Sequence, residues 1–202
     1  MDILLSETEQ NLLMLLEELT KHHDWIELSV LAEKLNCSIE ELQEHLFKLE
    51  QLFPNLLLQS RTKGIQLQFD LQNTLDPKIA IFKQSETYSF LNCLFFQEGQ
   101  SLEQMCQELM ISCERVQEII QHLNTELPQH YGISIQLSPL VINGAEEDIR
   151  AFYLDYFSQS YDFLDWPFPS ISEESLTHLI QLFLDAQQIS PNLSSLRQIK
   201  LL

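Results

Sequence analysis

The sequence predicts a mainly α-helical chain with small β wings, arranged as two tandem winged helix-turn-helix domains and a C-terminal helical segment. Three observations lead to this prediction. Apolar residues recur at three- and four-residue spacing over most of the 202 residues, which is typical of amphipathic helices. Short alternating apolar segments follow two of the helical groups, as expected for hairpins. The pattern of apolar, small and capping residues around Ser38 also recurs around Ser112.

The composition supports packed globular domains and constrains their partners. Of all residues, 45% are hydrophobic and 20% are charged, which excludes a wholly disordered chain. The 30 acidic residues outnumber the 11 basic ones and give a formal net charge of −19 at pH 7. Nucleic acids and anionic membranes repel such a chain by default, so any contact with DNA must come from local basic groups.

The first winged helix-turn-helix domain is predicted at residues 1–71. Ser6 and Ser38 each precede an apolar helical pattern, and Glu9 and Glu41 follow three residues later, which is the spacing of a capping box. Three helices followed by a hairpin are the element order of a winged helix. The expected elements are helices at 7–19, 28–35 and 39–53, strands at 55–59 and 65–69, and a hairpin tip at 61–64.

Residues 72–84 are predicted to connect the two domains, with Pro77 at the first position of a helix. The second winged helix-turn-helix domain is expected at 85–144, and residues 145–202 are expected to form a helical segment. Its expected elements are helices at 86–96, 102–109 and 113–127, the last ending at Pro128, and strands at 133–137 and 140–142.

The strongest signal is an internal repeat with a constant offset along the chain. Apolar residues match apolar ones, a small residue matches a small one, and the capping serines match. A small residue lets two helices cross closely, and an apolar stripe after the serine leaves the other helix face outward. The matched pairs are Leu28 and Leu102, Leu31 and Met105, Ala32 and Cys106, Leu35 and Leu109, Ser38 and Ser112, Leu42 and Val116, Leu46 and Ile120, and Leu49 and Leu123.

The outward faces and the wings supply the candidate DNA contacts. Arg and Lys side chains contact phosphates, Arg also recognises guanine, and Gln recognises adenine. Each candidate has a simpler interpretation: a helix cap for the serines, an ion pair with Glu114 or Glu118 for Arg115, and a solvated hairpin tip or surface polar group for the others. The candidates are Ser38, Gln43, Lys48, Arg61 and Lys63 in the first domain and Ser112, Arg115, Gln117 and Gln121 in the second.

Several other functions are not expected. The sequence has no phosphate-binding glycine-rich loop, nucleophile elbow or histidine cluster with metal-ligand spacing, so we predict no enzyme activity, cofactor or metal. It also has no signal peptide or long apolar run, which predicts no membrane association. The cysteines form no CxxC pair, which predicts reduced core thiols in a cytoplasmic chain; they are Cys37, Cys93, Cys106 and Cys113.

Several segments resemble the Mga family of transcriptional regulators. They are FLNCLFFQE at 90–98, SLE at 101–103, LVINGAEEDIRAFY at 140–153 and YDFLDWPFP at 161–169. The resemblance implies a DNA-binding regulator with two N-terminal winged helices, followed by regulatory domains of the phosphotransferase-system type. It also implies that 176–202 open the first regulatory domain. The sequence stops there inside an apolar helical pattern, so we expect a truncated chain.

Together these observations predict a regulator that binds double-stranded promoter DNA and works in the cytoplasm as a homo-oligomer that pools weak contacts. Phosphotransferase-system proteins are expected partners if a full regulatory domain exists. The acidic faces of the predicted recognition helices favour an alternative. In that alternative the chain is a protein-interaction module or an antagonist that pairs with a related regulator and has little DNA binding of its own.

Overall fold

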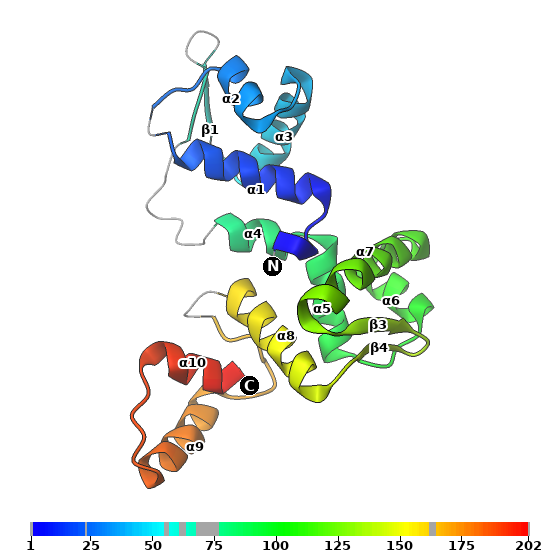
Figure 1. Ribbon diagram of the computed structural model, residues 1–202, viewed down its shortest axis with the longest axis vertical. Helices are drawn as coiled ribbons and strands as arrows, with labels where there is room; N and C mark the ends of the chain where they lie inside the picture. The colour runs from blue at the N-terminus through cyan, green and yellow to red at the C-terminus, as the bar shows by residue number, and fades with distance from the viewer. Residues whose placement is uncertain are drawn as a thin grey trace. The chain divides into compact units, whose positions relative to one another are not determined.

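The computed structural model describes residues 2–22, 24–54, 57–60, 64–67, 77–161 and 165–201 (Figure 1). The fold is mainly α-helical with two short antiparallel hairpins, which confirms the predicted fold class. The chain divides into two compact units, Leu4–Tyr88 and Ser89–Leu202, and each is described by itself.

The first unit is a three-helix group followed by a hairpin. Ser6 and Ser38 cap their helices with reciprocal capping boxes, as predicted. Leucines of the first and third helices, among them Leu15 and Leu49, are fully buried and form the core. The elements are a 3-10 helix η1 (Asp2–Leu4), α1 (Glu7–Thr20), α2 (Leu28–Leu35), α3 (Ile39–Leu52), β1 (Leu57–Ser60), β2 (Gly64–Leu67) and α4 (Pro77–Lys83).

The first hairpin is held against the helices by a short bridge to the segment before α2. The backbone N–H of Ile26 donates to the carbonyl of Ile65, and that of Ile65 donates back, each at 2.8 Å. Gly64 lies at this crossing with φ +95°, and a Cβ atom there would lie 2.0 Å from the carbonyl oxygen of Ile26. Only glycine allows the two backbones to approach this closely.

The second unit repeats the same arrangement. Val116, Ile120 and Leu123, which the repeat assigned to the core, are buried. The boundary between the units falls within α5. The elements are α5 (Glu86–Phe96), α6 (Leu102–Leu109), α7 (Cys113–Tyr131), β3 (Ser134–Leu137) and β4 (Leu140–Asn143).

The repeat extends to the backbone of both helix-turn-helix turns. Asn36 and Met110 adopt the same left-handed conformation at the ends of α2 and α6, with φ 52° and 56°. The next amide donates back to a small residue in each case, Cys37 to Ala32 at 3.1 Å and Ile111 to Cys106 at 3.3 Å. This is the Schellman pattern of helix termination. The second hairpin is also bridged to the segment before α6, at Gly99, Gln100 and Leu140.

Met110 provides a prediction for stability, because its side chain is 91% exposed and its left-handed backbone conformation disfavours most side chains. Asparagine tolerates this conformation, as at Asn36. Met110→Asn is therefore expected to raise the free energy of unfolding by about 0.5–1 kcal/mol, measured by urea denaturation. The reverse exchange, Asn36→Met, serves as the matched control and should lower it by a similar amount. An unchanged midpoint in Met110→Asn would contradict the interpretation.

Helix α7 continues beyond the predicted end at Pro128. Its last residue is Tyr131, and Gly132, which has a φ of +70°, forms the C-terminal cap. Tertiary contacts stabilise this last turn: the ring of Tyr131 lies 5.1 Å from that of Phe152, and its hydroxyl donates to Asp155. The local sequence pattern therefore predicts too short a helix, because the residues that stabilise its last turn lie more than a dozen positions away along the chain.

The C-terminal segment consists of α8 (Glu146–Ser160), α9 (Glu173–Ala186) and α10 (Leu193–Leu201). Aromatic residues of α8 form the core here: Phe152, Tyr156 and Phe157 are buried. The rings of Phe95 of α5 and Phe157 pack edge to face, with their centroids 4.7 Å apart. None of the helices in the described ranges is long and apolar enough to span a bilayer.

Candidate nucleic-acid interface

Helix α3 presents one face to solvent because Leu42, Leu46 and Leu49 bury the other. Gln43 and Lys48 lie on the exposed face, where the sequence placed them. Lys48 makes no ion pair with any described residue, so its ammonium group is available to a phosphate. The same face also exposes carboxylates at Glu40, Glu41 and Glu44, so the surface of α3 is predominantly acidic.

Phe47 of α3 was missed by the sequence reasoning. Its side chain is 63% exposed, although phenylalanine is usually buried. Phe47 lies in the sequence between the buried residues Leu46 and Leu49, and the helical spacing of these residues turns its side chain toward solvent. An exposed aromatic group on a recognition helix can contact a thymine methyl group or a base edge.

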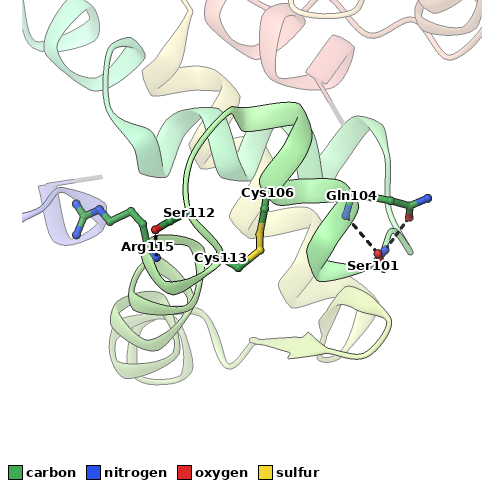
Figure 2. The surroundings of a disulfide bond; sticks show 6 residues. All are labelled: Ser101, Gln104, Cys106, Ser112, Cys113 and Arg115. Atoms are coloured by element: carbon green, nitrogen blue, oxygen red, sulfur yellow. Dashed lines mark hydrogen bonds between the residues drawn. A yellow bond between two sulfur atoms is a disulfide. The ribbon is translucent and has the colours of Figure 1, made fainter.

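Helix α7 presents an equivalent face. Arg115, Gln117 and Gln121 are exposed, as predicted. The guanidinium Nη1 of Arg115 lies 2.8 Å from Oε2 of Glu118, so Arg115 forms one of the two ion pairs considered from the sequence. Figure 2 shows the Arg115 side chain extending away from α6. The exposed ion pair contributes little stability and can be exchanged for a contact with DNA.

The two capping serines occupy equivalent positions at the entry to these helices. The hydroxyl of Ser38 accepts the backbone N–H of Glu41 at 3.1 Å, and that of Ser112 accepts the N–H of Arg115 at 3.2 Å (Figure 2). Hydrogen bonds from Ser38 also hold the pKa of the Glu41 carboxyl below its usual value. Both serines thus act as helix caps in this structure.

The two hairpins differ in the basic residues that they carry. Arg61 and Lys63 lie outside the described residues. The second hairpin and its flanks, residues 132–145, contain no Lys or Arg in the sequence, so this wing supplies no cation to a phosphate. The structure therefore brings Arg115, Gln117 and Gln121 together on α7, and Gln43 and Lys48 together on α3.

Other basic residues of the first unit are engaged by carboxylates. Glu18 of α1 pairs with Lys21 at 2.8 Å and with Lys34 of α2 at 2.7 Å. Hydrogen bonds from these two ammonium groups lower the pKa of Glu18 to about 2. Lys78 of α4 pairs with Glu17. Lys34 and Lys78 thereby link two helices each, and the charges of all three ammonium groups are partly neutralised, which leaves few cations for DNA.

The cysteines differ from the prediction. Cys106 of α6 and Cys113 of α7 form a disulfide, with Cα atoms 5.4 Å apart, so the prediction of four reduced thiols is wrong for this pair (Figure 2). Spacing within one helix cannot reveal this pair, because the close crossing of two helices brings the residues together. Cys37 and Cys93 are free. In the described part of the chain, no cluster of three or more His, Cys, Asp or Glu residues could hold a metal ion.

Two exposed helices, each the second helix of a winged helix-turn-helix, are the architecture of a DNA-binding transcriptional regulator. Comparison with known families supports this class. Residues 7–65 match the M protein trans-acting positive regulator (MGA) HTH domain, and residues 72–157 match the Mga helix-turn-helix domain. The chain belongs to the Mga family of regulators.

Curated relatives agree with this assignment. The chain is 37% identical to a protein of Streptococcus pneumoniae serotype 4 named as a trans-acting regulator, over 98% of this chain and 41% of the relative. It is 29% identical to the anthrax toxin expression trans-acting positive regulator of Bacillus anthracis, over 84% of this chain and 36% of that protein. The chain therefore spans about two-fifths of the length of these relatives.

Proposed function

We propose that this chain is the DNA-binding part of a transcriptional regulator and contacts double-stranded promoter DNA through α3 and α7. The observation that carries the proposal is the duplicated geometry: two equivalent turns present two equivalent helices to solvent, in a chain of the Mga family. Similarity to trans-acting regulators favours this function over a protein-interaction module without DNA binding.

The proposed contacts follow from side-chain chemistry. Arg115, Gln117 and Gln121 of α7 recognise base edges in the major groove, and Gln43 and Lys48 of α3 do the same in an adjacent site. Beyond these helices, Arg61 and Lys63 supply phosphate contacts from the first wing, and the caps Ser38 and Ser112 donate to phosphates at the helix entries.

The proposal further includes that the regulator acts in the cytoplasm as a homo-oligomer, and the charge balance supports the oligomer. Because basic groups supply most nucleic-acid affinity, a chain with a net charge of −19 has few phosphate contacts per copy. Linking several copies raises the overall affinity for DNA, although each copy makes only the same weak contacts. For residues 145–202 the proposal is the start of a regulatory domain of the phosphotransferase-system type, with proteins of that system as partners of the complete domain.

A binding titration tests the function. A preferred site is first selected from a randomised duplex library, and its affinity for the chain is then measured by fluorescence anisotropy at increasing salt. We expect specific binding that weakens with salt, with a slope of log K against log salt of about −0.9 for each phosphate contact. Failure to bind any duplex even at the lowest salt would refute the proposal.

Arg115→Ala is expected to weaken binding to the selected site about tenfold and to relax the preference at one base pair, because a guanine contact is lost. Arg150→Ala is the matched control: Arg150 is also an exposed arginine paired with a glutamate, Glu146, but it lies on α8. Both variants change the net charge equally, so only Arg115→Ala should alter base preference. Equal weakening by the two variants would show that Arg115 makes no specific contact.

A further inference from the structure

The disulfide joins the two helices of one helix-turn-helix but not those of the other. Cys106 and Cys113 correspond through the repeat to Ala32 and Ile39, which cannot form such a bond. Both turns nevertheless have a left-handed residue at the same position, Asn36 and Met110, and the same pair of backbone hydrogen bonds. The turn therefore forms without the bond, and the cysteine pair is an addition to the second unit that the fold does not require.

The two sulfur atoms have different surroundings. Cys106 is 6% exposed at the crossing of α6 and α7, whereas Cys113 is half-buried and is the first residue of α7. The N–H groups at a helix N-terminus favour the thiolate form of cysteine, which is the reactive form. Cys113 is thus accessible to a small oxidant, and Cys106 is positioned behind it as the resolving thiol.

The other two cysteines provide a contrast within the same chain. Burial raises the pKa of the Cys93 thiol to about 11, and burial together with Glu41 raises that of Cys37. Both therefore stay protonated and unreactive at neutral pH. Neither is bonded to another cysteine.

We propose that Cys106 and Cys113 are a reversible redox site that responds to peroxides and, in its oxidised form, clamps α7 against α6. The Cys113 thiolate attacks one peroxide oxygen of hydrogen peroxide, which gives a sulfenic acid and hydroxide; the hydroxide takes up the proton that the Cys113 thiol released. The Cys106 thiol then attacks the sulfenic sulfur, and the disulfide forms with loss of a second water. A thiol reductant then reduces the disulfide back to the two cysteine thiols and is itself oxidised to a disulfide. Disulfides in reducing compartments are usually transient and redox-sensing.

The clamp acts on the part of α7 that the proposed function uses. Cys113 lies next to the cap Ser112 and two residues before Arg115 (Figure 2). Cross-linking this turn to α6 reduces its freedom in the unbound protein. Pre-organised groups bind more tightly because less freedom is lost on binding. This consequence for DNA rests on the proposed function, whereas the redox chemistry does not.

The chemistry is tested on the whole chain by treating it with stoichiometric hydrogen peroxide, alkylating the remaining thiols and mapping peptides by mass spectrometry. We expect a 106–113 cross-linked peptide that dithiothreitol removes, and a Tm about 5 °C higher in the oxidised form. Cys113→Ser should abolish both changes, and the control Cys37→Ser should keep them. Alkylation of both Cys106 and Cys113 after peroxide treatment, or equal Tm values in the two states, would overturn the proposal.

The effect on DNA is measured separately with the selected duplex. Oxidised wild type should bind about threefold more tightly than reduced wild type, and Cys113→Ser should bind equally in both conditions. Equal binding by oxidised and reduced wild type would overturn the clamp as a control of DNA binding. If neither state binds DNA, the proposed function fails, and the peptide map still decides whether the redox pair exists.

Discussion

Replacing Phe152 with alanine is expected to lower the free energy of unfolding of the Ser89–Leu202 unit by about 3–5 kcal/mol. Phe152 is completely buried in α8, and its ring contacts those of Tyr131 at 5.1 Å and Tyr153 at 5.2 Å. The substitution removes a large apolar side chain and leaves a cavity that the surrounding rings cannot fill. Urea denaturation followed by circular dichroism measures the loss.

The same substitution at an exposed site provides the control. Phe47→Ala removes a ring that is 63% exposed on α3, so it should change the free energy of unfolding by less than about 0.5 kcal/mol. The last turn of α7, which includes Tyr131, should also lose protection against hydrogen exchange in Phe152→Ala. Similar stabilities of the two variants would show that the aromatic cluster of α8 is not the core of its unit.

Gly64→Ala is expected to destabilise the Leu4–Tyr88 unit by about 3–4 kcal/mol. The added Cβ atom would lie 2.0 Å from the carbonyl oxygen of Ile26, so the hairpin must move away and lose its two hydrogen bonds between Ile26 and Ile65. The left-handed backbone at φ +95° adds further strain. Urea denaturation gives the total, and hydrogen exchange at the Ile26 and Ile65 amides reports the lost bridge.

Gly99→Ala separates the two causes. Gly99 also has a positive φ, +87°, but a Cβ atom there would have no neighbour within 4 Å among the described residues. This variant should therefore cost only the conformational strain, about 1–2 kcal/mol. If Gly64→Ala and Gly99→Ala were equally destabilising, the close approach of the hairpin to Ile26 would not be the reason for glycine at position 64.

The repeated pattern predicted more of the molecule than its helices. It located the capping serines Ser38 and Ser112 at equivalent helix entries, and it placed Arg115 and Gln43 on outward faces. These features could be predicted because capping and amphipathic spacing are local: they depend on residues three or four positions apart. The assignment of the outward residues to DNA contacts stays a prediction that the binding titration tests.

Features that depend on distant residues were not predictable in the same way. Pro128 should end a helix, but contacts of Tyr131 with α8 continue α7 past it.

The sequence by itself determined the class of this protein: a duplicated helix-turn-helix chain, acidic overall, with two outward helices and few cations. Local periodicity and capping are sufficient for that, because each helix is specified by its own residues. Only the tertiary structure decided that Cys106 and Cys113 are bonded and that Gly64 meets Ile26. Both depend on how closely two backbones approach in space, a distance that packing sets and that spacing along the chain does not encode.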